Sequence, residues 1–219
     1  MEEIKTIGLT FVNAYLLKVK ENFILVDTGL AMHHEKLESE LTSAGCLPDR
    51  LKLVILTHGD LDHTGNCAML QKKYGCKIAM HEGDVPMVRD GVMIRRKVRS
   101  LQSRIFFLIR KLFRKKFVFD SFSPDILLTE GQRLNDYGLD AIVIHIPGHT
   151  KGSIGILTAE GNLFAGDTFT NRKKPATANL IENQDELNES LSRIKNMDIK
   201  MVYPGHGSPF DMKLISGKF

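Results

Sequence analysis

The stretch Thr57-His58-Gly59-Asp60-Leu61-Asp62-His63 decides how the rest of the chain is interpreted. It follows the apolar run 51–56, whose short length and β-branched residues predict a buried strand. Two imidazoles and two carboxylates therefore leave that strand within one loop. Packed together without a cation, the carboxylates would repel one another. So many potential ligands within one loop predict a divalent metal site. The alternative is an exposed polar turn after the strand.

Length and composition favour one domain covering residues 1–219. The chain is long enough for a sizeable core, and it contains no run of about 18 uncharged apolar residues of the kind that spans a membrane. Residues 1–5 do not have the pattern of a signal peptide. Cys46, Cys67 and Cys76 follow no zinc or disulfide spacing, so we expect buried thiols and a cytoplasmic protein.

The net charge of +4 hides a basic segment. Residues 89–116 hold 11 Lys and Arg against one acid, which leaves the remainder of the chain at −6. Around them, residues 86–122 are expected to form a basic amphipathic helical insert within the domain, because apolar residues recur every three or four positions. Three roles remain open: a helix packed on the body, a lid over the site, or a peripheral contact with an anionic membrane.

The rest of the chain alternates predicted strands and helices. Strands are expected at 6–9, 14–19, 23–26, 53–56, 77–80, 126–128, 139–146, 153–158, 162–165 and 200–203, and helices at 33–44, 65–74 and 184–196. Gly45 and Gly75 stand where glycines end helices. This order predicts a layered α/β fold.

Three further strands are followed by a metal-binding type of residue. His149, Asp167 and His206 come shortly after the strands predicted at 139–146, 162–165 and 200–203, each beside a glycine. Sites in open α/β sheets gather at strand ends, and glycine lets the backbone turn tightly there. We expect these three side chains to converge with the loop at 57–63.

In these residues the sequence resembles the metallo-β-lactamase superfamily, hydrolases with a four-layer αβ/βα sandwich and a binuclear metal site. The five signatures of that family occur in order as Asp27, the loop 58–63, His149, Asp167 and His206. The resemblance implies that His58, Asp60 and His149 hold one metal, that Asp62, His63 and His206 hold a second, and that Asp167 bridges them. It also implies that Asp27 supports the ligand loop through hydrogen bonds.

One residue departs from the family pattern. Most members have His-x-His-x-Asp-His, whereas this chain has Asp60 at the second histidine. The site gains an oxygen ligand and a negative charge, so we expect two divalent ions, zinc first, with iron or manganese as alternatives. A degenerate site that has lost one metal is the competing interpretation, and the presence of every other ligand argues against it.

The resemblance implies hydrolysis of a small-molecule substrate by a hydroxide shared between two metals, with Asp62 as the catalytic residue that orients it and passes on its proton. We expect an ester, thioester or lactone as substrate, as in the glyoxalase-II-like and lactonase-like branch. A phosphodiesterase or nuclease that uses the basic insert is the second hypothesis, although we do not expect a nucleic-acid partner. The third is a non-catalytic or membrane-associated binding protein.

The other histidines are expected to be structural. His33 and His34 lie at the start of a predicted helix, His81 lies just after a predicted strand, and His145 lies inside one.

Overall fold

A computed structural model describes residues 3–89, 120–177, 180–215 and 217. Most of the basic insert predicted at 86–122, including its amphipathic stretch, lies outside the described residues. The single-domain assignment and the role of the insert therefore stay predictions. Within the described ranges, no helix is long and apolar enough to cross a membrane.

The first half of the chain forms a six-stranded sheet in the order β1-β2-β3-β4-β5-β6. Its strands are β1 (Glu3–Leu9), β2 (Val12–Val19), β3 (Asn22–Val26), β4 (Leu51–Ile55), β5 (Lys77–His81) and β6 (Ile126–Leu128). β1, β2 and β3 pair antiparallel, and β3 to β6 pair parallel. The carboxyl ends of the parallel strands therefore meet at one edge of the sheet.

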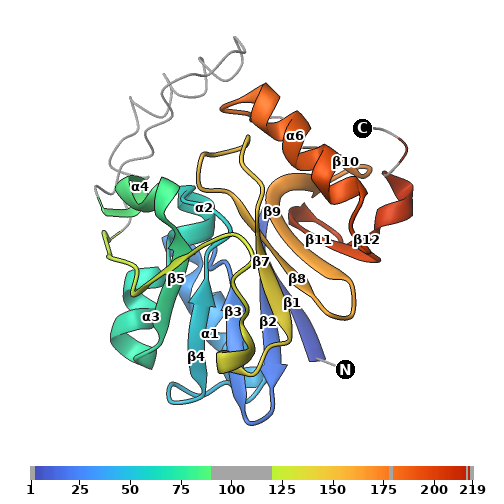
Figure 1. Cartoon of the computed structure of the whole chain (residues 1–219). Helices are drawn as coiled ribbons and strands as arrows, with labels where there is room; N and C mark the ends of the chain where they lie inside the picture. The colour runs from blue at the N-terminus through green and yellow to red at the C-terminus, as the bar shows by residue number, and fades with distance from the viewer. Residues whose placement is uncertain (1–2, 90–119, 178–179, 216, 218–219) are drawn as a thin grey trace.

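The second half forms another sheet, in the order β12-β11-β9-β8-β7, with β10 paired to β9. Its strands are β7 (Ala141–His145), β8 (Ile154–Thr158), β9 (Asn162–Asn171), β10 (Ala176–Thr177), β11 (Met201–Gly207) and β12 (Phe210–Asp211). All neighbours are antiparallel except β9 and β11, which run parallel. Figure 1 shows the two sheets side by side, with helices on their outer faces.

The helices complete four layers. They are α1 (His34–Ser43), α2 (Leu61–Thr64), α3 (Cys67–Tyr74), α4 (Val85–Arg89) and α6 (Gln184–Lys195), with short 3-10 turns η1 (Ala31–His33), η2 (Glu82–Asp84), η4 (Asn135–Tyr137) and η5 (Met212–Leu214). Leu41 of α1 and Leu70 of α3 pack on the outer face of the first sheet, and Leu191 of α6 packs on the second. The αβ/βα sandwich is confirmed.

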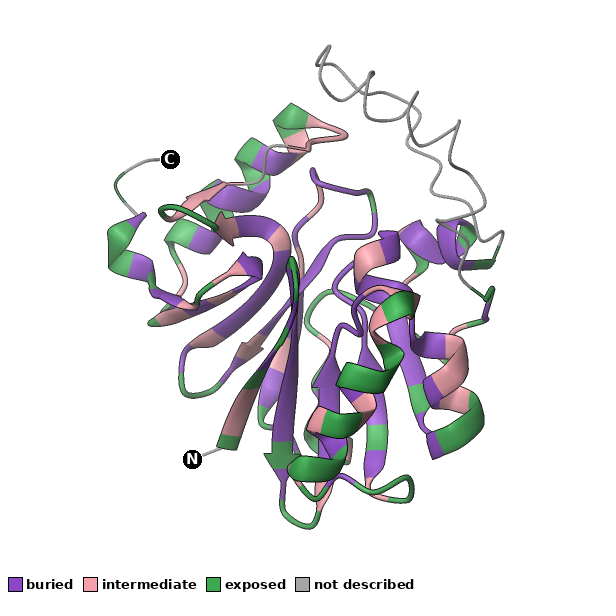
Figure 2. Ribbon diagram, turned by 180° about the vertical axis from the view of Figure 1, so that it is seen from behind, coloured by how far each residue is buried: buried purple, intermediate pink, exposed green. Residues whose placement is uncertain are grey.

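The core between the sheets follows from strand alternation. On β2, Leu16 faces the cluster under α1 and α3, whereas Leu17 faces the cluster between the sheets. Phe164 of β9 enters that same central cluster from the second sheet. Each fully buried aliphatic or aromatic side chain contributes roughly 1.5–3 kcal/mol. Figure 2 shows the result, with buried strands inside and exposed residues on the outer faces of the helices.

Most predicted elements are confirmed with small differences at their ends, but two strand ends were wrong. β9 was expected to end at residue 165 and β11 at residue 203, and both run on, to Asn171 and Gly207. Their pairing shifts register on either side of Pro204, whose ring nitrogen cannot donate a ladder hydrogen bond, and then resumes. Asp167 and His206 consequently lie inside irregular strands and not in loops after them.

Candidate metal centre

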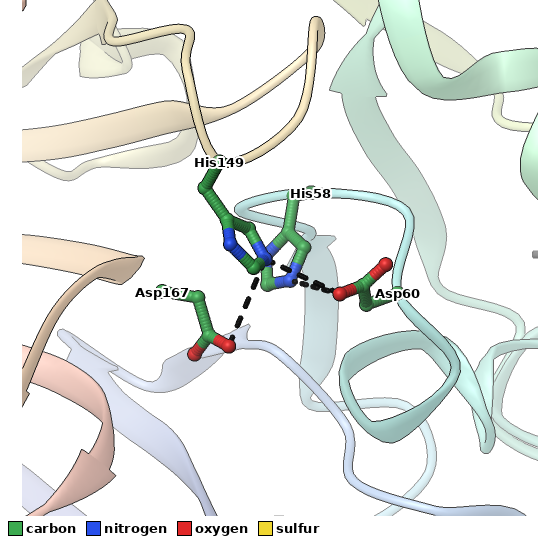
Figure 3. Close-up of side chains that lie close together, drawn as sticks. All are labelled: His58, Asp60, His149 and Asp167. Atoms are coloured by element: carbon green, nitrogen blue, oxygen red, sulfur yellow. Dashed lines mark hydrogen bonds and ion pairs between the residues drawn. The ribbon is translucent and has the colours of Figure 1, made fainter. Parts of the chain in front are cut away.

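The predicted site residues come together from loops, a short helix and two strands. His58 and Asp60 follow β4, and Asp62 and His63 lie on the short helix α2. The turn between β7 and β8 supplies His149, while β9 and β11 supply the remaining two. Figure 3 shows the side chains of His58, Asp60, His149 and Asp167 pointing toward one another.

One group of potential ligands consists of His58, Asp60, His149 and Asp167, with one ligand atom from each lying within 4.8 Å of the others. Asp60 Oδ2 lies 3.6 Å from His58 Nε2 and 3.2 Å from His149 Nε2. These side chains are almost fully buried, with His58 and His149 each 1% exposed. The departure at position 60 thus places a carboxylate directly against two imidazoles.

A second group consists of Asp62, His63 and His206, within the same 4.8 Å limit. Asp62 Oδ2 lies 3.5 Å from His206 Nε2 and 3.9 Å from His63 Nε2. The Asp62 side chain is 31% exposed, whereas His63 is fully buried. Solvent therefore reaches this group on the side of Asp62.

Asp167 lies between the two groups. Its Oδ2 is 3.7 Å from His149 Nε2 on one side and 3.2 Å from His206 Nε2 on the other, while its Oδ1 is 3.3 Å from His63 Nε2. The Asp167 side chain thus contacts histidines of both groups.

All four histidines present Nε2 to the cluster, because each Nδ1 is already engaged. His63 Nδ1 donates to Asp27 Oδ2 at 2.8 Å, and His149 Nδ1 donates to the Leu180 carbonyl at 2.5 Å. His206 Nδ1 donates to the Phe11 carbonyl. A carboxylate or carbonyl accepts here, so each of these Nδ1 atoms carries a hydrogen, and Nε2 is the ring nitrogen that faces the cluster.

His58 follows the same rule through a hydroxyl. Thr57 Oγ1 donates to Asp27 Oδ2 at 2.8 Å, and its lone pair faces His58 Nδ1 at 3.0 Å. His58 Nδ1 therefore donates, and its Nε2 is buried with no hydrogen bond to any residue that the structure describes. A buried lone pair beside several carboxylates fits a cation, which would satisfy it.

Asp27 supports the ligand loop as the family resemblance implied. Its backbone has a φ of +59°, and its Oδ1 accepts the Thr57 amide at 2.9 Å. The same carboxylate accepts from Thr57 Oγ1 and His63 Nδ1. One buried acid thus fixes the start of the loop and the ring orientation of its last histidine.

The pKa values of His63 and Asp167 are shifted by their charged neighbours. Burial alone would lower the pKa of His63, but the carboxylates of Asp27, Asp167 and Asp62 raise it well above its usual value. Burial would likewise raise the pKa of Asp167, and nearby imidazoles, His63 first, hold it well below its ordinary range. The Asp167 carboxylate therefore stays ionised and attracts positive charge.

Several supporting residues were missed from the sequence. Asp84 accepts hydrogen bonds from two ligand loops, and a carboxylate three residues beyond β5 was the available signal. The Leu180 and Phe11 carbonyls gave no signal, since every residue has one. His81 and His145 stack on each other with centroids 4.1 Å apart and belong to neither ligand group, and the three cysteines are buried and free.

The chain is similar to known proteins over most of its length. The sequence profile described as the metallo-β-lactamase superfamily matches residues 7–206. A probable metallo-hydrolase of Methanocaldococcus jannaschii is 30% identical over 210 residues, which covers 93% of this chain and 91% of that protein. An acyl-coenzyme A thioesterase of Homo sapiens is 25% identical over 166 residues, covering 71% of this chain and 57% of that protein.

Solved structures share the fold. A subclass B3 metallo-β-lactamase of Bradyrhizobium japonicum superposes with a TM-score of 0.71 at 21% identity, covering 94% of this chain and 75% of that one. A metallo-β-lactamase family protein of Thermus thermophilus gives 0.72 at 23% identity, covering 96% and 74%. With the profile match across nearly the whole chain, the protein belongs to the metallo-β-lactamase superfamily.

Proposed function

We propose that the protein is a binuclear metal-dependent hydrolase that cleaves a small ester, thioester or lactone. His58, Asp60 and His149 would hold the first metal, Asp62, His63 and His206 the second, and Asp167 would bridge them. The observation that carries the proposal is the direction of the histidines: each has its Nδ1 hydrogen engaged and its Nε2 facing the carboxylates. Rings fixed in this way present Nε2 to a metal.

Different residues of the site have different roles in the proposed reaction. When bound, divalent ions lower the pKa of a water molecule toward neutrality and polarise a carbonyl oxygen. Asp62 is the exposed member of the cluster, so its carboxylate can orient the attacking water, take its proton and deliver it to the leaving group. His58 and His149 are buried, so a metal ion bound to them would lie away from bulk solvent.

Asp60 bears on the choice of metal. Zinc accepts carboxylate ligands beside imidazoles, and we propose it as the first candidate, with iron and manganese as alternatives because harder oxygen donors suit them. The added negative charge beside His58 and His149 also makes a bound water less acidic than in a site with a third imidazole.

Thioesters are the substrate class to test first. The similarity to an acyl-coenzyme A thioesterase supports a thioester, and the exposed side at Asp62 supports access by a carbonyl group attached to a larger leaving group. A thiolate is also a good leaving group, which lowers the demand on Asp62 as an acid.

The test is a substrate panel on protein loaded separately with zinc, manganese and iron. The panel contains short and medium acyl-coenzyme A thioesters, γ- and δ-lactones, aryl esters and a phosphodiester. We expect turnover of carbonyl substrates that depends little on salt. Turnover of the phosphodiester alone, weakening steeply with salt, would move the assignment to the nuclease hypothesis.

Matched variants tie activity to the cluster. His63→Ala and Asp167→Ala should abolish turnover and reduce the metal content below two ions per chain, measured by elemental analysis. His34→Ala is the control, because His34 is exposed on α1 and outside both groups. Full activity in either ligand variant would overturn the binuclear assignment.

A further inference from the structure

Asp84 is a buried carboxylate outside the ligand groups. It ends η2, directly after β5, and is 1% exposed. The turn that delivers it is closed by His81 Nδ1, which accepts the Gly83 amide at 3.1 Å. A buried, ionisable side chain that ligates nothing needs other partners to offset its lost hydration.

Those partners come from two different ligand loops. Asp84 Oδ2 accepts the Gly59 amide at 2.8 Å, from the loop that carries His58 and Asp60. The same oxygen accepts Thr150 Oγ1 at 2.7 Å, and Oδ1 accepts the Gly152 amide at 2.8 Å. Thr150 and Gly152 belong to the turn that carries His149. One carboxylate therefore joins a loop of the first sheet to a turn of the second.

Close packing leaves little freedom at this junction. A Cβ at Gly152 would lie 2.6 Å from Asp84 Cγ, and a Cβ at Gly59 would lie 3.0 Å from Asp84 Cβ. A Cβ at Gly83 would lie 3.0 Å from Gly152 Cα. The glycines let both loops close on the carboxylate, and charge-assisted hydrogen bonds in such a dry environment are short and strong.

We propose that Asp84 is a positioning residue that sets the separation of these two loops, and with it the spacing of the first metal's ligands His58, Asp60 and His149. This proposal rests on the proposed function, which assigns the first metal to these three ligands. Asp27 has a different task, because it bonds to Thr57 and His63 within the first loop. The two buried acids thus act on different ligands.

Asp84→Asn is the direct test. The amide has only one acceptor oxygen, so an N–H₂ group must face either the Gly59 or the Gly152 amide. We expect one of the two zinc ions to bind about 10- to 100-fold more weakly, the usual effect of losing such a supporting bond. Asp125→Asn is the matched control, since Asp125 accepts the Ile78 amide at the opposite end of β5.

Two backgrounds identify which ion is affected. In His206→Ala, where the second group lacks a ligand, Asp84→Asn should weaken the remaining ion. In His149→Ala, where the first group lacks a ligand, Asp84→Asn should have little further effect on the ion that remains. Equal weakening in both backgrounds would mean general destabilisation and would overturn the proposal. Unchanged binding of both ions in a folded Asp84→Asn protein would also overturn it.

A measurement on metal-free protein separates this proposal from the function. Hydrogen exchange should be faster in Asp84→Asn than in wild type at the Gly59 amide, the Gly152 amide or both, and unchanged at both in Asp125→Asn. If wild type binds fewer than two ions, the proposed function fails, but hydrogen exchange still tests whether Asp84 joins the two loops. Unchanged exchange in Asp84→Asn would overturn the role of Asp84.

If Asp84→Asn does not fold, Thr150→Val is the second variant, because it removes a single hydrogen bond to Asp84. It should weaken binding of the same ion and speed exchange at the Gly152 amide, both less strongly than Asp84→Asn. A Thr150→Val protein unchanged in both would refute the proposal.

Discussion

Asp60 is the residue that separates this site from the usual family pattern. Its Oδ2 contacts both His58 and His149, so the carboxylate occupies the centre of the first ligand group. Its charge adds to that of Asp167, which lies across His149 from it. The buried imidazoles offset this charge in part, and a divalent ion would offset the rest.

Asp60→His should raise the preference of the site for zinc over manganese, because an imidazole replaces a hard oxygen donor. Protein loaded with equal concentrations of both metals should retain a higher ratio of zinc to manganese, by about tenfold if the change in relative binding free energy is near 1.4 kcal/mol. Elemental analysis after desalting measures the ratio. A fall in that ratio would show that Asp60 is not a ligand.

Metal loading should release a proton from His63. The pKa of His63 in the metal-free protein is raised well above its usual value by Asp27, Asp167 and Asp62 against the effect of burial. His63 is therefore protonated at neutral pH, and a metal must displace that proton. Zinc affinity should rise with pH until the raised pKa is passed.

Calorimetric zinc titrations at pH 7 in two buffers of different ionisation enthalpy measure this release. The apparent enthalpies should differ in proportion to the protons released, in wild type and in His34→Ala alike. Identical enthalpies in the two buffers would contradict the assignment.

That the residues of the candidate site gather in two groups could be predicted from the sequence, because histidines and aspartates stand near glycines and strand ends. Their supports could not, for two physical reasons. The Leu180 and Phe11 carbonyls are backbone groups without a residue signature, and Asp84 acquires its partners only when two sheets meet. Residue type therefore predicts which side chains can bind a metal. The hydrogen-bond partners that fix their orientation depend on tertiary contacts.

At the scale of elements, β9 and β11 carry Asp167 and His206 of the candidate site inside paired strands. A Cβ at Gly205 on β11 would lie 2.3 Å from Asp167 Oδ1 and 2.7 Å from His63 Cε1. Gly166 adopts a φ of +49°, and a Cβ there would lie 2.3 Å from Thr57 Oγ1. The sequence indicated turns at these glycines, but their role is to let strand backbone approach ligand atoms.

Gly205→Ala should therefore displace Asp167 or His63. We expect loss of metal from the loaded protein together with about 1–3 kcal/mol of unfolding free energy, the usual cost of overpacking. Urea unfolding and elemental analysis measure the two effects. Gly8→Ala on β1 is the control, since a Cβ there meets nothing within 4 Å. Normal metal content in Gly205→Ala would show that the neighbouring side chains move at little cost.

At the scale of the whole molecule, the site joins two halves that also share a core. Leu17 and Ile55 from the first sheet and Phe164 from the second lie in one buried cluster. The layered α/β class could be predicted from the order of strands and helices along the chain. The order of the strands within each sheet could not, because non-local pairings such as β9 with β11 depend on contacts between distant segments.

Removing metal from loaded protein should lower the midpoint of thermal unfolding and keep a single transition. Zinc at 100 times its dissociation constant adds about 2.7 kcal/mol if it binds only the folded state, which corresponds to roughly 5–10 °C in a domain of this size. Calorimetry with and without a chelator measures the shift. The shift should disappear in Asp167→Ala, and a midpoint in wild type that does not respond to the chelator would contradict metal binding across the two sheets.

The use of a main-chain acceptor for His206 has a consequence for divergence among relatives. The Phe11 carbonyl orients the His206 ring, while the Phe11 side chain is 71% exposed beside it. A carbonyl is present whatever the side chain is, so mutation at residue 11 can alter the surface next to the cluster without removing the acceptor. Mutational tolerance at residue 11 alongside intolerance at Asp27 is the pattern expected of a site that can change substrates while keeping its metals.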